Sequence, residues 1–288
     1  MPVEKRRREN VSDRLDDYPL YVQVEWRLAR SRFLGNVFHH GLWEPRRRWH
    51  RLMWRWKKRR RPDSLVHSAA RVYSQNDEDG MLLEVFKRIG EGTKYAVEFG
   101  ISSGDECCTR NLIAHHGWGG LVMDGSEANI VRARQTYAPF PVQVGAHFIT
   151  LENIVSLFRS YDVPQRHDLL VVDIDGNDYW VLGALLQHYQ PRVIVAEYNG
   201  RWWPPTEWVM SYRPDHVWDW TCYGGASLTS LNKLCTAYGY RLVGCDPCGV
   251  NGFFVHRDEL GDRFPDASYG VGYHFVPPAG WHPLRKHA

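Results

Sequence analysis

Two short apolar runs, each ending in acidic residues and glycine, constrain the fold of this chain more than any other feature. The first spans residues 94–104 with the sequence KYAVEFGISSG, and the second spans residues 167–176 with the sequence HDLLVVDIDG. Each run has the length and composition of a buried parallel strand followed by a tight turn. Ligands of open α/β sheets bind in the crevice outside the carboxyl ends of such strands. The two runs therefore predict a parallel sheet with an acidic binding site along one edge.

Strand and helix patterns alternate from about residue 79 to residue 256. We expect strands over 95–99, 120–123, 142–148, 168–173 and 191–197, and helices over 79–89, 105–115, 127–136, 153–160, 179–188 and 228–238. Such alternation predicts βαβ units. Two further strands, 240–244 and 252–256, are separated by a short turn, so the last strand should run antiparallel. The predicted fold class is α/β: a Rossmann-like, mostly parallel sheet with a C-terminal antiparallel hairpin strand, preceded by a basic N-terminal helical arm.

Charge and composition divide the chain into three predicted parts. Residues 1–63 hold 18 Lys/Arg and 8 Asp/Glu, whereas the net charge of the whole chain is only +3. We assign residues 1–65 to a basic N-terminal arm, residues 66–260 to the α/β domain and residues 261–288 to an irregular C-terminal tail. Segment 46–61 has its tryptophans and aliphatic residues at helical spacing. This basic helix either binds an anionic membrane surface or nucleic acid, or packs its tryptophans on the body of the protein.

The sequence also predicts where the protein resides and how its cysteines are used. No stretch has the roughly 20 apolar residues that span a membrane, and the N-terminus lacks the apolar part of a secretory signal. We expect a cytoplasmic protein, peripheral to the membrane if segment 46–61 binds lipid. Such a protein needs no disulfides. Cys222, Cys235, Cys245 and Cys248 contain one C-x-x-C pair, but their spacing favours buried apolar cysteines over a zinc site.

The turns after the first two strands predict a cofactor that carries a nucleoside. Gly100 and Gly104 permit a tight turn and a close approach of ligand to backbone. Asp124 ends the second strand, where a carboxylate is placed to bind a ribose diol. Two ordinary turns with acidic helix caps are the alternative. Glu98 precedes the first glycine and would repel a pyrophosphate, so the pattern favours a cofactor with a cationic end, such as the amino group of S-adenosylmethionine (SAM).

The order of these elements and motifs resembles class I SAM-dependent methyltransferases. The segments YSQNDEDG at 73–80 and VDIDGND at 172–178 resemble the FkbM branch of that class, which includes O-methyltransferases of sugars and natural products. The resemblance covers about residues 70–256. It departs from the branch at residues 175–178, which read DGND where FkbM proteins commonly read EGAE. The resemblance makes residues 66–260 a SAM-binding methyltransferase domain.

The resemblance also implies roles for individual residues. Glu98 would bind the amino-acid end of SAM, Asp124 would bind the ribose, and the segment 148–152 would lie by the adenine. The complete set of expected cofactor-binding residues is Gln75, Glu98, Gly100, Gly104, Asp124, Gly125, Ser126 and Ile149.

Acidic side chains gather where methyl transfer would take place. We expect Asp173 and Asp175 to be catalytic, with one of them as general base. Carboxylate and amide oxygens at neighbouring strand ends suit a hard divalent cation, so Asp173, Glu197 and Asn199 are candidate ligands of Mg²⁺. A site without metal, in which the remaining acids cap the next helix, is the alternative.

An insertion of about thirty residues, rich in tryptophan and tyrosine, separates strand 191–197 from helix 228–238. Long loops inside a compact domain are usually functional. We expect this insertion to form a lid over the cleft, with a separate hydrophobic cluster as the alternative. Most histidines of the domain should be structural, and His147 is the one we would test.

The expected function is SAM-dependent O-methylation of a hydroxyl on a sugar-bearing or natural-product metabolite or a glycolipid, with or without Mg²⁺. The partners would be this small-molecule or glycan acceptor and, through segment 46–61, an anionic membrane. Nucleic acid is a further polyanion for that helix, and a homo-oligomer is compatible with the sequence. The rival functions are an NAD-dependent sugar-nucleotide enzyme and a non-catalytic Rossmann-like binder that docks through the arm.

Overall fold

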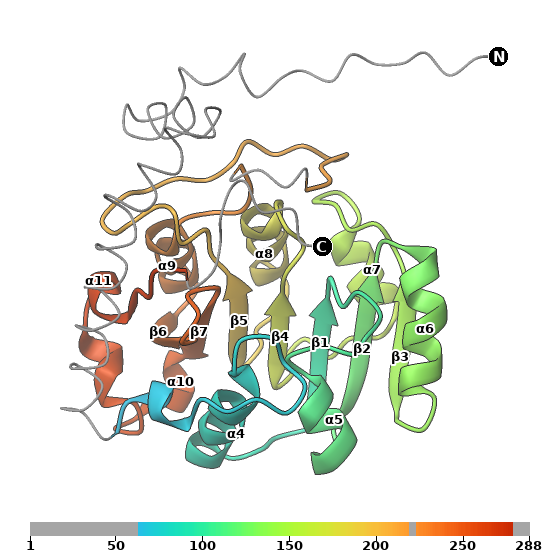
Figure 1. Ribbon diagram of the computed structural model, residues 1–288, viewed down its shortest axis with the longest axis horizontal. Helices are drawn as coiled ribbons and strands as arrows, with labels where there is room; N and C mark the ends of the chain where they lie inside the picture. Colours follow the sequence, from blue (N-terminus) through green and yellow to red (C-terminus); the bar gives the residue numbers. More distant parts are fainter. Residues whose placement is uncertain (1–62, 219–222, 279–288) are drawn as a thin grey trace, which may run out of the picture. The chain divides into compact units, whose positions relative to one another are not determined.

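The computed structural model describes residues 63–218 and 223–278. All of them belong to one of two compact units of the chain, which spans Trp54–Trp281. Its centre is a seven-stranded sheet with the order β3-β2-β1-β4-β5-β7-β6 (Figure 1). The strands are β1 (Tyr95–Phe99), β2 (Gly119–Asp124), β3 (Val142–Ala146), β4 (Leu169–Val172), β5 (Val193–Glu197), β6 (Tyr240–Cys245) and β7 (Asn251–His256).

The pairing of the strands confirms the predicted fold class. The five strands β1 to β5 are parallel to one another, whereas β7 is antiparallel to both β5 and β6. From β1 the chain proceeds outward to β2 and β3 and then returns to β4 on the other side of β1. The crevice outside the carboxyl ends of β1 and β4 is therefore the switch point at which such folds bind ligands.

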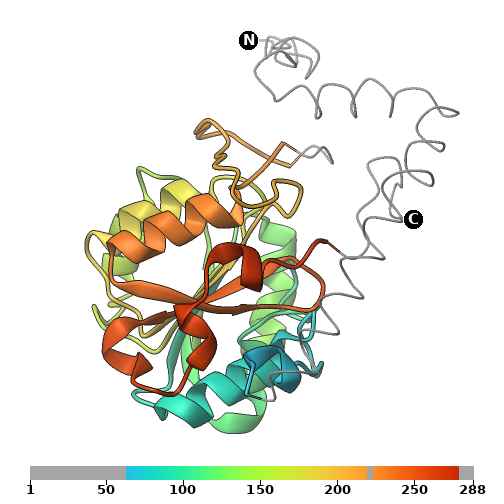
Figure 2. The ribbon, with the colours of Figure 1, turned by 90° about the vertical axis from the view of Figure 1, so that its left-hand side faces the viewer.

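Helices cover both faces of the sheet (Figure 2). They are α4 (Glu78–Ile89), α5 (Arg110–His116), α6 (Glu127–Tyr137), α7 (Ile154–Ser160), α8 (Asp178–Leu186) and α9 (Leu228–Ala237). Helix α5 begins at Arg110, not at residue 105 as predicted, because the Glu98 carboxyl group binds the backbone of residues 108 and 109 ahead of it. The shorter elements are η3 (Leu65–Ser68), α10 (Arg257–Leu260), η4 (Pro265–Ser268) and α11 (Val271–His274).

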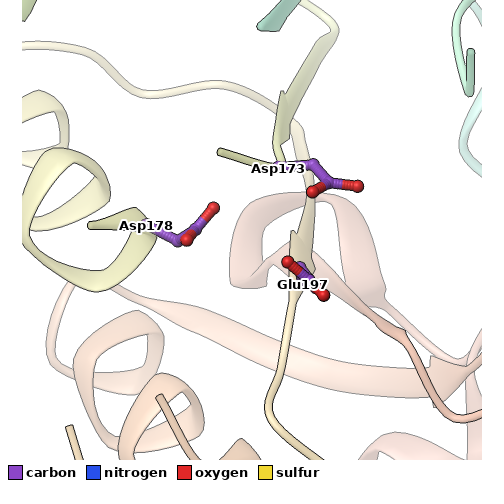
Figure 3. Close-up of side chains that lie close together, drawn as sticks. All are labelled: Asp173, Asp178 and Glu197. Atoms are coloured by element: carbon purple, nitrogen blue, oxygen red, sulfur yellow. The ribbon is translucent and has the colours of Figure 1, made fainter. Parts of the chain in front are cut away.

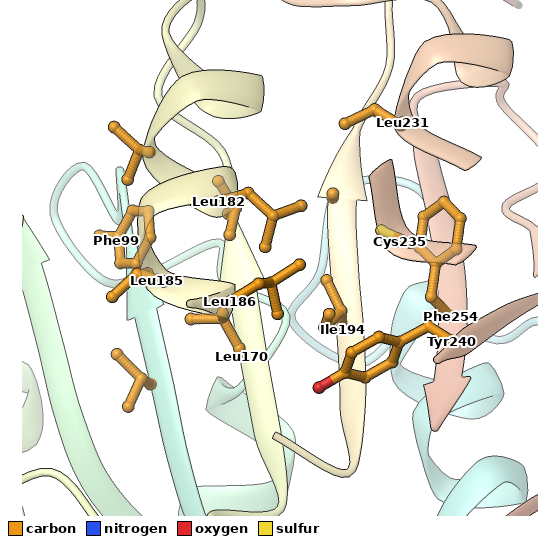
Figure 4. Close-up of a cluster of buried hydrophobic side chains, with 14 of the residues drawn as sticks. Phe99, Leu170, Leu182, Leu185, Leu186, Ile194, Leu231, Cys235, Tyr240 and Phe254 are labelled. Carbon is orange, nitrogen blue, oxygen red and sulfur yellow. The ribbon is translucent and has the colours of Figure 1, made fainter. Parts of the chain in front are cut away.

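Alternation along the strands divides the core into two layers. Val97 and Phe99 of β1 pack with Leu170 of β4 and with helices α7, α8 and α9 (Figure 4). Ala96 faces the opposite layer, which includes α4 and α5. Strands buried on both faces read as continuous apolar runs, which is why β1 and β4 are so visible in the sequence. The layers hold the sheet rigid beneath its carboxyl edge.

The C-x-x-C pair forms the turn between β6 and β7. The buried carboxyl group of Asp246 accepts hydrogen bonds from the backbone amides of residues 248, 249, 250 and 251, so this acid holds the hairpin. Cys245 and Cys235 are buried free thiols and Cys248 is partly exposed. Within the described residues no group with metal-ligand geometry contains a cysteine, and Cys222 lies outside them.

Most of the predicted basic arm, including segment 46–61, lies outside the described residues. Leu65 and Val66 at its end are buried against the domain. The part of the tail that the structure describes contains the short helices η4 and α11. Among the described helices, none is long and apolar enough to cross a membrane.

Candidate functional site

The register of the sheet aligns the predicted site residues at one edge. Phe99 of β1 lies opposite Met123 of β2 and Val172 of β4, and Val172 lies opposite Ala196 of β5. The residues that follow these positions therefore leave the sheet at the same level. They include Gly100, Asp124, Asp173 and Glu197.

Glu98 organises the turn after β1. It is only 5% exposed, and its carboxyl group accepts 2.9 Å hydrogen bonds from the backbone amides of Cys108 and Thr109. The Thr109 hydroxyl donates a third bond to it. Burial raises the pKa of Glu98, while these donors oppose the shift. Direct contact of Glu98 with a cofactor stays a prediction, and its structural role is to fix residues 100–109.

Two glycines let this turn approach its neighbours. Gly100 has a φ of +82°, and a Cβ atom there would lie 1.5 Å from the carbonyl oxygen of Asp173. Gly104 has a φ of +79°, and its Cβ would lie 2.7 Å from the ring of Tyr137. Any other residue at position 100 would separate the first turn from the end of β4. The glycine pattern thus brings the expected cofactor turn against the expected catalytic acids.

Asp124 connects the turns after β1 and β2. Its Oδ2 atom accepts a 2.8 Å hydrogen bond from the Ser102 amide, and its Oδ1 atom accepts bonds from the Ser126 amide and the Asn129 side chain. The Ser126 hydroxyl caps helix α6 by accepting from the Asn129 amide. Asp124 is 9% exposed, and both of its carboxylate oxygens already accept hydrogen bonds within the protein.

An aromatic side chain lies beside this acid. Phe148 follows β3, is 44% exposed, and lies where a Cβ on Gly125 would come within 3.1 Å of its ring. The neighbouring Ile149 is buried in the core. The segment predicted to lie by the adenine therefore offers one open ring next to the predicted ribose position.

Three carboxyl groups converge beyond β4 and β5. Oxygen atoms of Asp173, Asp178 and Glu197 lie within 4.8 Å of one another (Figure 3). Asp173 and Glu197 are hydrogen-bonded to each other, and the pKa of each is raised well above its ordinary value, mainly by burial and then by the neighbouring acids. Burial and mutual repulsion therefore both favour the protonated forms of this pair, and a bound cation would oppose that effect.

Asp178 also holds the turn that leads into α8. Its two oxygen atoms accept hydrogen bonds of 2.7 Å and 2.8 Å from the amides of Ile174 and Gly176. Asn199, the third predicted metal ligand, uses its side chain elsewhere: its amide donates to the Gly224 carbonyl, and its oxygen accepts from the Arg201 amide. The carboxyl cluster that the structure forms thus contains Asp178, which was not among the predicted metal ligands.

Asp175 lies on the rim of the same edge. Its backbone has a φ of +56°, a left-handed conformation that residues other than glycine rarely adopt. The residue as a whole is exposed, but loss of solvent around its carboxyl group is the first cause that raises its pKa, to about 6. The negative charges of Asp178 and Asp124 raise the pKa further, whereas His216 lowers it. Asp124, the predicted ribose ligand, and Asp178 of the carboxyl cluster therefore both raise the pKa of Asp175.

The aromatic insertion spans the ends of β3, β4 and β5, and Figure 1 shows it crossing that edge of the sheet. The Tyr212 hydroxyl donates to the carboxylate of Glu152 and accepts from the Leu151 amide after β3. The Trp180 indole of α8 donates to the Met210 carbonyl. The insertion is thus fastened over the carboxyl edge, as a lid would be.

The insertion also has an aromatic cluster of its own. The rings of Trp202 and Trp208 are stacked with centroids 4.6 Å apart, and Tyr223 packs edge-on against Trp208. The aromatic cluster of the alternative interpretation is therefore part of the insertion, and its role as a lid stays a prediction.

Two other predicted residues have protein partners. The Gln75 side chain donates a 3.3 Å bond to Glu106 in the turn after β1, which brings the segment before α4 against the predicted cofactor turn. His147 is bonded to the Tyr161 hydroxyl at 2.8 Å. Gln75 adjoins the site, whereas His147 has a structural partner.

Sequence reasoning assigned no catalytic or metal-binding role to Asp178, the third acid of an Asp-x-Asp-x-x-Asp pattern, and it missed His216. His216 lies in the insertion and contacts the turn after β4 through its ring. No local pattern marks it, because 41 residues separate it from Asp175.

No known protein-family model matches this sequence, and no curated protein matches it. Several solved structures are similar in part. The N-terminal domain of EvdMO1, solved with S-adenosylhomocysteine (SAH) and D-fucose, is 15% identical over 64% of this chain and 83% of that one, with a TM-score of 0.42. CalS10, a SAM-bound amino pentose methyltransferase from Micromonospora echinaspora, is 13% identical over 66% and 92%, with a TM-score of 0.41. The plantazolicin methyltransferase BamL is 14% identical over 67% and 73%, with a TM-score of 0.40. Likenesses at this level do not assign a family.

Proposed function

We propose that this protein is a SAM-dependent methyltransferase that methylates a hydroxyl group of a small molecule. The observation that carries the proposal is the carboxyl-rich edge of the sheet beside the glycine turn. Glu98, Asp173, Asp175 and Glu197 all have a raised pKa, with burial as the first cause and other acids among the next ones. His216 opposes one of these shifts, because its charge lowers the pKa of Asp175.

Such an edge favours a cationic ligand. At an effective dielectric constant of about 20, opposite unit charges about 4 Å apart attract by about 4 kcal/mol. The sulfonium and ammonium groups of SAM gain this attraction, whereas the pyrophosphate of NAD is repelled by the same carboxylates. The charge of the crevice therefore supports SAM over a dinucleotide.

Different residues at this edge of the sheet would bind different parts of SAM. Asp124 would bind the ribose hydroxyls, with Gly125 and Ser126 forming the turn beneath. Phe148 offers a face for the adenine, and Ile149 supports it from the core. Gly100 and Gly104 would let the methionine part approach the backbone that Glu98 fixes. When bound, SAM supplies a methyl group on a positively charged sulfur atom.

The remaining residues would act on the acceptor. Asp173 and Asp175 would attract its hydroxyl group and polarise the O–H bond. The insertion would cover the reacting groups, exclude water and align the acceptor oxygen, and positioning of this kind contributes up to about 7–11 kcal/mol. The aromatic rings of the insertion suit a sugar ring or a natural-product scaffold, including a glycolipid. The resemblance to the FkbM branch is part of this proposal.

The carboxyl cluster supports a divalent cation in the same site. Three carboxyl groups within 4.8 Å of one another match the oxygen ligands that Mg²⁺ prefers. We assign Asp173, Asp178 and Glu197 as its ligands, in place of the predicted Asn199. The cation would lower the pKa of the acceptor hydroxyl.

Calorimetry with purified protein tests the proposal. We expect SAM and SAH to bind, and NAD not to bind. Heat with NAD alone would favour the sugar-nucleotide enzyme. No heat with any of the three, together with salt-sensitive binding to anionic vesicles or nucleic acid, would favour the non-catalytic binder.

A further inference from the structure

The insertion places an imidazole ring over the turn that follows β4. The Nε2 atom of His216 lies 3.2 Å from the carbonyl oxygen of Asp175. The ring lies so close to Gly176 that a Cβ there would come within 2.2 Å of the His216 Cδ2 atom. A glycine at this position is therefore a condition for the ring to rest on the turn.

The contact with Asp175 fixes the roles of the two ring nitrogens. A carbonyl oxygen only accepts hydrogen bonds, so Nε2 must carry a proton and donate it. The neutral ring then has its lone pair on Nδ1. Among the described residues Nδ1 has no hydrogen-bond partner, and His216 is half-buried. The Nδ1 atom of His216 is thus a basic nitrogen beside the turn after β4, with access to solvent.

Other contacts hold this part of the insertion in place. The Asn177 side chain donates a 2.7 Å bond to the Arg213 carbonyl, and the His216 amide donates to that same carbonyl at 3.0 Å. The carboxyl group of Asp175 interacts electrostatically with His216. Arg213 and Asp215 are the charged neighbours on its own segment.

We propose that His216 is the base that accepts the hydroxyl proton of the acceptor on Nδ1, with Nε2 held by the Asp175 carbonyl. This inference rests on the proposed methyltransferase function. The acceptor oxygen forms a bond to the methyl carbon while the carbon–sulfur bond breaks, and the bonding electrons stay on sulfur. The hydroxyl proton passes to Nδ1 and then to solvent. The positive charge of the donor thereby ends in water as that proton.

The position of His216 suits this task better than that of the carboxyl pair. Asp173 and Glu197 are hydrogen-bonded to each other, whereas Nδ1 of His216 has no such partner among the described residues. His216 belongs to the insertion that crosses the carboxyl edge, and its half-buried ring lets the proton leave to solvent.

The test uses nuclear magnetic resonance on the full chain with ¹⁵N-labelled histidine and needs no acceptor. His216→Gln identifies the resonances of His216, and exposed His188 at the opposite edge of the sheet is the internal control. We expect the tautomer with the proton on Nε2. We also expect the imidazole ¹⁵N resonances of His216, recorded at one fixed pH, to differ between the SAM and SAH complexes, because SAM carries one more positive charge nearby.

Each outcome decides the matter. Different His216 resonances in the two complexes, with the same His188 resonances in both, support the base. Binding of both ligands with identical His216 resonances, or a proton on Nδ1, overturns it and leaves the methyltransferase function standing. Absence of SAM and SAH binding in calorimetry refutes the proposed function and this inference with it. The His216→Gln variant retains a donor to the Asp175 carbonyl, and we expect it to bind SAH within about threefold of the native protein.

Discussion

The carboxylate of Asp124 accepts a 2.8 Å hydrogen bond from the backbone amide of Ser102. This bond joins the turn after β2 to the turn after β1, although the residues are 22 positions apart in the sequence. A ligand that spans both turns therefore meets a preorganised surface. Preorganisation favours binding because less conformational entropy is lost.

Asp124→Ala should abolish binding of SAH. The substitution removes both the predicted ribose ligand and the connection between the turns. We expect native protein to gain thermal stability with SAH and the variant to gain none, as measured by differential scanning fluorimetry. Asp124→Asn keeps one acceptor for the Ser102 amide and should retain a weakened response. A normal response in Asp124→Ala would exclude Asp124 from the ribose site.

The features that were predictable from the sequence are those set by local patterns. The strands β1 and β4 are short and largely buried and apolar, so their composition and the acids near their ends mark them. The start of α5 was not predictable, because it depends on where the Glu98 carboxyl group reaches across the turn. The hairpin of β6 and β7 was predictable because only a short turn separates the two strands.

The partners of the site residues were harder to predict. Asn199 has the right position along the chain for a metal ligand, but the backbone of the insertion engages its side chain. His216 reaches the turn after β4 only through the path of the insertion. Local propensity and spacing contain no information on such long-range contacts, which depend on the packing of a segment that is neither helix nor strand.

Glu98→Ala should destabilise the protein by about 2 kcal/mol. Loss of the carboxyl group leaves the buried amides of Cys108 and Thr109 without partners, and each unsatisfied buried group costs about 1–3 kcal/mol. Urea unfolding measures this change. Because the turn that Glu98 fixes is the predicted cofactor turn, the affinity for SAH should fall with stability. A variant that loses SAH affinity at unchanged stability would instead indicate direct contact between Glu98 and the ligand.

Asp175→Asn should raise the melting temperature of the ligand-free protein at pH 8. The pKa of Asp175 is raised to about 6 in the folded state, compared with about 3.9 in unfolded chains. The folded state therefore holds the proton more tightly, and the contribution of Asp175 to stability is lost as the pH rises from about 4 through 6. The amide stays neutral, so the difference from native protein should vanish near pH 4. Thermal melts at both pH values check this, and equal melting temperatures at pH 8 would contradict it.

Millimolar Mg²⁺ should stabilise the native protein more at pH 8 than at pH 5. The cation requires deprotonated ligands, and the pKa values of Asp173 and Glu197 are raised. At ten times its dissociation constant, a ligand stabilises the folded state by about 1.4 kcal/mol. Glu197→Gln should remove this gain, whereas Glu207→Gln, an exposed acid in an ion pair with Lys233, should retain it. An equal gain in both variants would show that Mg²⁺ binds elsewhere.

Arg192→Met should destabilise the protein without changing its affinity for SAH. The guanidinium lies at the edge of the sheet opposite the site, 2.7 Å from the Asp168 carboxylate and 2.8 Å from that of Glu259. Asp168 is fully buried, and removal of one partner of a buried ion pair costs about 3–5 kcal/mol. Backbone amides of Gly92 and Lys94 still donate to Asp168, so the loss should lie at the lower end of that range. Urea unfolding and calorimetry with SAH separate the two quantities. A weakened affinity for SAH in a folded Arg192→Met variant would show that the two edges of the sheet are coupled.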